Sequence, residues 1–248
     1  MPVNRLRIIA GPNGSGKTTL YFFLKDNIHT GIWLNADEIL EQFNRKGFIE
    51  YSLLGFTPSA RAFKNFCRKK NVQKFIHDFN LINNIDSIQF GQFAVTYSSK
   101  SFSNELAAFL TNFFRYYLIN KQHSLITETV FSHESKLAFV KEAKRKNYRT
   151  YLYFIATNSS EINIKRIFSR VYKGGHTVPK EKVRSRYSKS ILLLKKSIAI
   201  FDRVYIFDNS SKAIQLAASY ENGQLEKIYM DIIPDWLNFL FQQNNSST

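Results

Sequence analysis

Short apolar runs alternate with amphipathic stretches along most of this chain. Each run has the length of a buried strand, and the stretches between them show the spacing of helices that pack on one face. Strands that alternate with helices indicate right-handed crossovers and a mostly parallel sheet covered on both faces. The pattern predicts a three-layer α/β fold with strands at 6–10, 31–34, 123–127, 150–156 and 203–207 and helices at 17–26, 103–119, 135–146, 160–172 and 180–200, plus a helix that runs through Phe43.

Two regions depart from this alternation. Segments 212–220 and 225–230 flank an Asn-Gly pair, which predicts a C-terminal hairpin, followed by a last helix after Pro234 and a flexible tail at 242–248. Residues 47–101 have no regular strand–helix alternation, and within them Pro58 to Phe79 reads as one basic amphipathic helix. We therefore expect a single domain, 1–241, that carries a helical insertion or cap at 47–101.

Composition narrows the class of protein. With 44% hydrophobic residues and 23 Phe in 248 residues, the chain has enough apolar material for one large core. Cys67 is the only cysteine, so no internal disulfide forms, and the five His residues are too scattered for a zinc site. The chain start runs directly into the first strand and no apolar run is long enough to span a membrane, which predicts a cytoplasmic protein. The net charge of +16 favours anionic partners such as nucleotides, nucleic acid or acidic proteins.

The strongest motif follows the first predicted strand. Residues 11–19 fit the phosphate-binding P-loop, G-x-x-x-x-G-K-[ST], between a strand and a helix as the motif requires. Its glycines let successive backbone N–H groups point into one phosphate nest, Lys17 reaches the β- and γ-phosphates, and the Thr18 hydroxyl joins the shell of a Mg²⁺ ion. The predicted nucleotide-binding residues are Gly11, Asn13, Gly14, Ser15, Gly16, Lys17, Thr18 and Thr19.

A P-loop by itself does not separate GTPases, motor ATPases and small-molecule kinases. The chain has no Asn-Lys-x-Asp for guanine and no apolar strand that ends in an Asp-Glu pair. Instead, Asp37 and Glu128 follow two predicted strands, where the carboxyl ends of parallel strands form ligand sites. One carboxylate can accept a hydroxyl proton while the other orients a substrate, which favours a kinase.

At this point the chain resembles the zeta toxin family, P-loop kinases of bacterial toxin–antitoxin systems. The order and rough spacing agree over residues 5–45 and 102–210. The matching residues are Gly11-Pro12-Asn13-Gly14-Ser15-Gly16-Lys17-Thr18-Thr19, Asn35-Ala36-Asp37-Glu38-Ile39, Glu128-Thr129, Phe131-Ser132, Arg166, Arg170, Gly174-Gly175-His176-Thr177-Val178-Pro179, Arg186-Tyr187 and Asp208-Asn209-Ser210. A departure is Val130, where family members commonly place Thr.

The resemblance implies a P-loop kinase-like fold with a five-stranded sheet and an ATP- and Mg²⁺-dependent phosphotransferase. Its acceptor would be a hydroxyl group of a nucleotide sugar such as UDP-N-acetylglucosamine, and its partner an acidic antitoxin protein. By that analogy Asp37 is the catalytic base and Lys17 neutralises the transferring phosphoryl group. By the same analogy Arg170, with Arg166 as the second choice, is the cation that clamps phosphate from the helix before a lid.

The remaining implied roles concern the two substrates. Glu128 and Thr129 would hold the acceptor, and Asn209 would border the adenine. Several of these residues have a second interpretation from sequence alone: Asp37 as a helix N-cap, Arg166 and Arg170 as a surface pair, and residues 208–210 as a simple turn. The loop 173–179 fits either a linker or a lid with a Gly-Gly hinge.

Two other functions stay open from the sequence. The basic segments Pro58 to Phe79 and Ser135 to Lys146 would suit a polynucleotide kinase, which binds an anionic polymer. The third hypothesis is a nucleotide-dependent interaction module, or a toxin that a partner protein holds inactive.

Overall fold

A computed structural model describes residues 3–99, 101–172 and 178–241. The chain divides into two compact units, Met1–Thr30 with Glu128–Thr248, and Gly31–Thr127. Residues 47–101, which the sequence analysis treats as an insertion, lie inside the second unit. No helix of the described residues is both long and apolar enough to cross a membrane.

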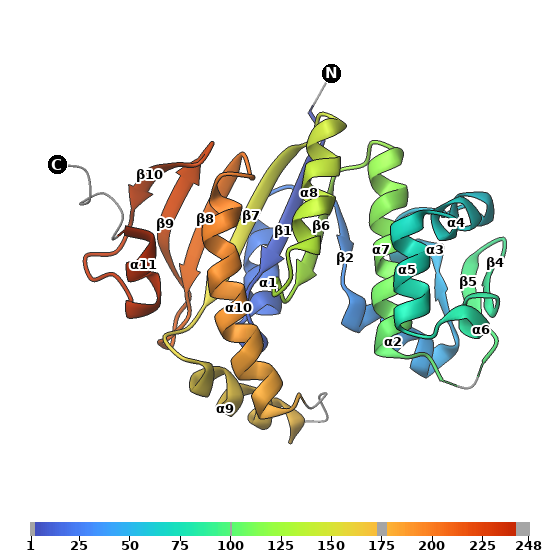
Figure 1. Cartoon of the computed structure of the whole chain (residues 1–248), viewed down its shortest axis with the longest axis horizontal. Helices are drawn as coiled ribbons and strands as arrows, with labels where there is room; N and C mark the ends of the chain where they lie inside the picture. The colour runs from blue at the N-terminus through green and yellow to red at the C-terminus, as the bar shows by residue number, and fades with distance from the viewer. Residues whose placement is uncertain (1–2, 100, 173–177, 242–248) are drawn as a thin grey trace. The chain divides into compact units, whose positions relative to one another are not determined.

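The first unit contains most of the predicted strands and helices. Three parallel strands pair in the order β8–β7–β1, and an antiparallel hairpin extends them through β9 and β10. In Figure 1, α8 and α10 cover the front of this sheet and α1 lies behind it. The elements are β1 (Arg5–Ala10), α1 (Lys17–Asn27), α8 (Ser135–Arg145), β7 (Arg149–Ala156), α9 (Ser160–Val171), α10 (Lys180–Ile198), β8 (Arg203–Asp208), β9 (Gln215–Glu221), β10 (Gln224–Ile228), η1 (Asp235–Leu237) and α11 (Asn238–Phe241).

The predicted hairpin is confirmed, and it explains why the sheet is larger than expected. Asn222 and Gly223 both have left-handed backbone angles, φ 50° and 83°, as a two-residue hairpin turn of this type requires. The strand order is β10-β9-β8-β7-β1-β6-β2, in which β6 is Leu125–Thr129 and β2 is Ile32–Leu34, so the sheet has seven strands rather than the predicted five. The five predicted strands are present, and the hairpin adds two more because β9 pairs antiparallel with β8 and β10 pairs antiparallel with β9.

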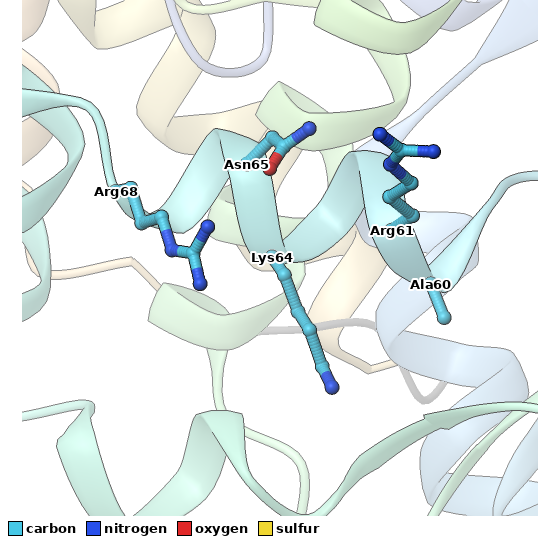
Figure 2. Close-up of a pocket in the computed structure, with 5 residues that line it drawn as sticks. All are labelled: Ala60, Arg61, Lys64, Asn65 and Arg68. Carbon is cyan, nitrogen blue, oxygen red and sulfur yellow. The ribbon is translucent and has the colours of Figure 1, made fainter.

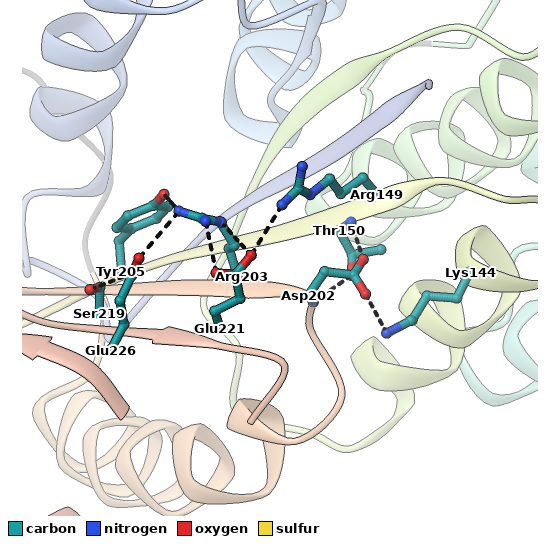
Figure 3. A network of polar contacts seen from close by, with 9 residues as sticks. All are labelled: Lys144, Arg149, Thr150, Asp202, Arg203, Tyr205, Ser219, Glu221 and Glu226. Atoms are coloured by element: carbon teal, nitrogen blue, oxygen red, sulfur yellow. Dashed lines mark hydrogen bonds and ion pairs between the residues drawn. The ribbon is translucent and has the colours of Figure 1, made fainter. Parts of the chain in front are cut away.

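Polar contacts join the amino-terminal ends of β7 and β8 (Figure 3). Asp202 accepts hydrogen bonds from the backbone N and the hydroxyl of Thr150, at 2.7 and 2.8 Å, and pairs with Lys144 at 2.7 Å. Burial raises the pKa of the Asp202 carboxyl, but the hydrogen bonds from Lys144 and Thr150 outweigh it and lower that pKa. Arg149 and Arg203 both pair with Glu221 on β9, which ties the three strands together at this edge.

The second unit has a parallel strand pair and a smaller sheet. Leu34 of β2 lies opposite Thr127 of β6, and β3, β5 and β4 form an antiparallel sheet of three strands. The segment 47–101, predicted as a helical insertion or cap, therefore contains strands as well as helices. The sequence did not indicate β4 and β5, because they pair within a stretch too short and irregular to show a strand period. The elements are β2 (Ile32–Leu34), α2 (Ala36–Lys46), β3 (Phe48–Glu50), α3 (Tyr51–Leu54), α4 (Ala60–Cys67), α5 (Lys70–Asp78), α6 (Ile82–Ile85), β4 (Ile88–Phe90), β5 (Ala94–Tyr97), α7 (Asn104–Asn120) and β6 (Leu125–Thr129), whose last two residues belong to the first unit.

The single helix predicted from Pro58 to Phe79 is two helices, α4 and α5, separated at Lys69, whose backbone is extended. At 3.6 residues per turn, Phe66 and Val72 would lie about 120° apart around one straight helix. Both side chains are buried, and Phe66 packs against Phe109 and Phe113 of α7. The break turns both apolar faces inward.

Candidate active site

The P-loop connects β1 to α1 with a backbone that only glycine allows at two points. Gly11 has φ 149°, and a Cβ there would lie 2.0 Å from the Ile155 carbonyl oxygen. Gly16 has φ 101°, and a Cβ there would lie 2.3 Å from Nδ2 of Asn209. Close backbone approach and left-handed angles are the features a phosphate nest needs, so the turn has the geometry that the motif predicts.

Lys17 and Thr18 open α1 and meet a carboxylate. The Lys17 side chain is buried; its Nζ donates to the Pro12 carbonyl at 3.0 Å and lies 3.8 Å from Oε1 of Glu128. The Thr18 hydroxyl donates to Oε2 of Glu128 at 3.0 Å. One cation, one hydroxyl and one carboxylate therefore converge at the beginning of the helix, where its dipole favours anions.

These groups fit a Mg²⁺ ion that is shared with a bound nucleotide. Mg²⁺ prefers oxygen ligands and is usually held by one or two carboxylates together with substrate phosphates and water. Thr18 and Glu128 supply a hydroxyl and a carboxylate oxygen 3.0 Å apart. The described residues contain no group of three His, Cys, Asp or Glu side chains that could hold a metal without a substrate.

Asn209 supports the P-loop from the end of β8. Its Nδ2 donates to the Ser15 carbonyl at 2.8 Å, and its backbone N donates to the Ala156 carbonyl at 2.8 Å. The side chain is buried and also lines the cavity described next. Asn209 thus fixes the P-loop, whereas its expected contact with adenine stays a prediction.

A cavity of about 1020 Å³ opens beside the P-loop in the first unit. Its polar wall includes Glu128, Arg166 and Arg170, and its apolar wall includes Phe207, Ile214 and Leu216. Clefts of this size with an apolar body and a few polar groups are typical of small-molecule sites. The cavity has room for an anionic ligand with an apolar or aromatic part.

The two predicted phosphate-binding arginines both lie on α9 and both line this cavity. Nη2 of Arg166 donates weakly to the Ser211 carbonyl at 3.5 Å, and its buried Nη1 has no hydrogen-bond partner among the described residues. A buried guanidinium nitrogen without a partner carries a desolvation cost that a phosphate oxygen would offset. Arg166 and Arg170 therefore both line the cavity beside the P-loop, and their phosphate-binding role stays a prediction.

A further arginine reaches the P-loop without a role assigned from the sequence. Nη1 of Arg186, on α10, donates to Oδ1 of Asn13 at 3.2 Å. The side chain is half-buried, and burial lowers the pKa of its guanidinium. Only its place in the family-like motif Arg186-Tyr187 marked this residue, because helical spacing does not distinguish it from the other basic residues of α10.

Asp37 lies in the second unit, in the first turn of α2. The N-cap of this helix is Asn35, whose Oδ1 accepts a hydrogen bond from the Asp37 backbone N at 2.8 Å. The alternative role of Asp37 as the cap is therefore wrong, and its exposed carboxylate is not used for capping. Asn35 is the better cap because its extended backbone precedes the first helical residue.

A buried polar chain fixes the strand end just before Asp37. Nε and Nη2 of Arg115 both donate to the Thr127 hydroxyl, at 2.9 and 2.6 Å. An arginine cannot accept, so the single hydroxyl proton of Thr127 goes to the Leu34 carbonyl at 2.9 Å. Leu34 is the last residue of β2, and burial lowers the pKa of Arg115 to about 10.

Two predictions remain, Thr129 as a substrate-binding residue and 173–179 as a lid. Thr129 is half-buried at the end of β6, and the carbonyl of the following Val130 accepts a hydrogen bond from Ser190 at 2.6 Å. Residues 173–177 of the predicted lid lie outside the described residues. Val178, just after them, packs against the buried cluster of Ile164, Ile167 and Val183.

Comparisons with known proteins identify a family and a fold. The model of the zeta toxin family matches residues 81–219, which is more than half of the 248 residues. A search of curated proteins gave no match. A solved structure of the PezAT chromosomal toxin–antitoxin system of Streptococcus pneumoniae is 14% identical with a TM-score of 0.52, covering 86% of this chain and 72% of that chain. The AvrRxo1-ORF1:ORF2 complex is 13% identical with a TM-score of 0.52, covering 90% of this chain and 60% of that chain.

At these identities the structural likeness shows the fold alone. It confirms the predicted α/β class with a mostly parallel sheet of the P-loop kinase kind.

Proposed function

We propose, because this chain belongs to the zeta toxin family, that it transfers the γ-phosphate of ATP to a hydroxyl group of a nucleotide sugar such as UDP-N-acetylglucosamine. Family membership supports a kinase-type enzyme. The observation that carries the proposal is the convergence of Lys17, Thr18 and Glu128 beside a cavity whose wall holds Arg166 and Arg170. This set matches the demands of a triphosphate, which needs several cations and a hydroxyl for its metal ion.

The donor half of the proposed site works mainly by position and charge. Backbone N–H groups of the P-loop bind phosphate oxygens, and Lys17 neutralises charge that develops on the transferring group. Mg²⁺, when bound to Thr18 and Glu128, would offset the negative charge of the β- and γ-phosphates. Nη1 of Arg166 has a free bonding position for a phosphate oxygen, and Arg186 holds Asn13 of the loop.

The acceptor half rests on Asp37. In the proposed reaction the acceptor oxygen bonds to the γ-phosphorus, the bond from that phosphorus to the bridging oxygen breaks, and ADP leaves. The carboxylate of Asp37 takes the proton from the attacking hydroxyl. Glu128 and Thr129 are proposed to hold the acceptor, with Glu128 serving both halves.

We also propose that an acidic protein of the antitoxin type binds this chain. The net charge of +16 suits an acidic partner. The PezAT structure comes from a toxin–antitoxin system, and AvrRxo1-ORF1 was solved in complex with ORF2.

The test is incubation with labelled ATP and a panel of nucleotide sugars, nucleosides and oligonucleotides, followed by mass spectrometry. A phosphorylated nucleotide sugar, absent with Lys17→Ala and Asp37→Ala, is the expected product. Phosphorylated oligonucleotides would point instead to a polynucleotide kinase, and free phosphate alone to an ATPase. Full transfer by the Asp37→Ala variant would remove Asp37 from the mechanism.

A further inference from the structure

The surface of α4 carries positive charge that no neighbouring residue offsets. Arg61, Lys64 and Arg68 are exposed and form no ion pair with any described residue. With Asn65 they follow the spacing i, i+3, i+4, i+7, which places all four on one face of the helix. Together with Ala60 they line a shallow hollow of about 420 Å³, and Figure 2 shows Lys64 and Arg68 extended away from the helix.

The charge continues beyond α4. Between Ser59 and His77 the sequence has no Asp or Glu, whereas Lys69, Lys70 and Lys74 add to the three cations above. Like charges three and four residues apart destabilise a helix, so this composition works against the helices that carry it. We define the basic surface as Arg61, Lys64 and Arg68.

Other basic helices of the chain form ion pairs with part of their cations. On α8, Lys144 pairs with Asp202 and Arg145 with Glu142. On α10, Arg184 pairs with Glu161 and with Glu181. Exposed lysines without an ion pair to a described residue also occur on α8 and α10, so α4 differs in that its three cations share one face and none of them forms such a pair.

Buried aromatic side chains anchor the helix that carries these charges. On the opposite face of α4, Phe63 and Phe66 are buried and contact Phe109 and Phe113 of α7 at ring-centroid distances of 5.0 to 6.0 Å. A helix anchored by an aromatic cluster holds its exposed cations at fixed spacing, so they are preorganised for a ligand.

We propose that the basic surface binds nucleic acid through its phosphate backbone and without sequence preference. The hollow is lined by cations, one amide and one alanine, with no large apolar or aromatic side chain. Protein partners usually dock through aromatic or aliphatic side chains that become buried at the interface. Contacts to the phosphate backbone of a nucleic acid are made mainly by Lys and Arg. The absence of an aromatic residue in the lining also argues against base stacking.

The test is fluorescence anisotropy of a labelled DNA duplex of about 20 base pairs across a series of salt concentrations. It uses the full chain with Lys17→Ala and no ATP, so the result does not depend on kinase activity. The triple variant Arg61→Ala, Lys64→Ala, Arg68→Ala is expected to bind at least about tenfold more weakly and to lower the slope of log K against log salt by about 2 to 3. Replacing Arg61 and Arg68 by Lys should keep most of the binding, because phosphate recognition needs charge.

The matched control is Lys141→Ala, Lys182→Ala, Lys189→Ala, which removes the same charge from exposed positions on α8 and α10. It should bind DNA within about twofold of the parent, since most of the affinity comes from local phosphate contacts. Equal losses in both triple variants would show diffuse attraction and overturn the proposal. So would no saturable binding at physiological salt, or tighter binding of a poly-glutamate peptide than of the duplex.

Discussion

The absence of a side chain at Gly16 allows the P-loop to pack against Asn209. A Cβ at Gly16 would meet Nδ2 of Asn209 at 2.3 Å, so Gly16→Ala must displace the bond from Asn209 to Ser15. We expect a loss of about 1–3 kcal/mol in the free energy of unfolding, from backbone strain, and at least tenfold weaker nucleotide binding. Thermal unfolding and calorimetric titration with ATP measure the two effects.

Gly47→Ala is the control for this prediction. Gly47 also has a left-handed φ, 76°, but a Cβ there would have nothing within 4 Å. It should lower stability by about 1 kcal/mol and leave the nucleotide affinity unchanged. If Gly16→Ala binds ATP as the parent does, Asn209 does not support the phosphate nest.

The hydroxyl of Thr127 is the second decisive group at this scale. Thr127→Val keeps the shape of the side chain but removes the acceptor for Nε and Nη2 of the buried Arg115. We expect a loss of about 1–3 kcal/mol or more, because charged donors remain buried. Thr127→Ser keeps the hydroxyl and should cost about 1 kcal/mol for the lost methyl group. Urea denaturation measures the free energy of unfolding of both variants. If Thr127→Val and Thr127→Ser lose the same amount, the Thr127 hydroxyl does not contribute to stability.

At the scale of elements, the reactivity of the Cys67 thiol reports on the packing of α4. Cys67 ends α4, and burial raises the pKa of its thiol to about 11. At pH 8 the thiolate fraction should be about a hundredfold smaller than in the unfolded chain, so alkylation should be slower by about that factor. Mass spectrometry of iodoacetamide labelling, with and without urea, measures the ratio.

The raised pKa of Cys67 also predicts the direction in which stability changes with pH. A thiol whose pKa is raised by folding contributes stability below the unfolded pKa of about 9 and loses that contribution as pH rises toward 11. Unfolding free energy should therefore fall over this range more in the parent than in Cys67→Ser. Labelling as fast as in urea would show that α4 does not bury Cys67.

The elements also show what the sequence could and could not predict. The parallel strands and the hairpin were predictable because buried runs and an Asn-Gly turn follow from local chemistry. The break at Lys69 was not, since it depends on where α7 places Phe109 and Phe113. In the site, the P-loop motif specifies Lys17 and Thr18, whereas the contacts of Glu128, Arg186 and Asn209 arise between residues far apart in the sequence.

On the scale of the whole molecule, the net charge of +16 serves two anion sites in the proposals made above. The P-loop and the cavity beside it lie in the first unit and the basic surface in the second. Each site has its own fixed groups, a phosphate nest in one and unpaired cations on a helix in the other.

Nucleotide and nucleic acid should therefore bind this chain independently. A non-hydrolysable ATP analogue with Mg²⁺ is expected to slow hydrogen exchange in peptides from Gly11 to Phe23, and a DNA duplex to slow it in α4. At constant ionic strength, a saturating concentration of the analogue should change the DNA affinity by less than about twofold, because sites without shared groups contribute additively. Displacement of the duplex by the analogue would mean that both ligands compete for the P-loop, and the basic surface would then have no ligand of its own.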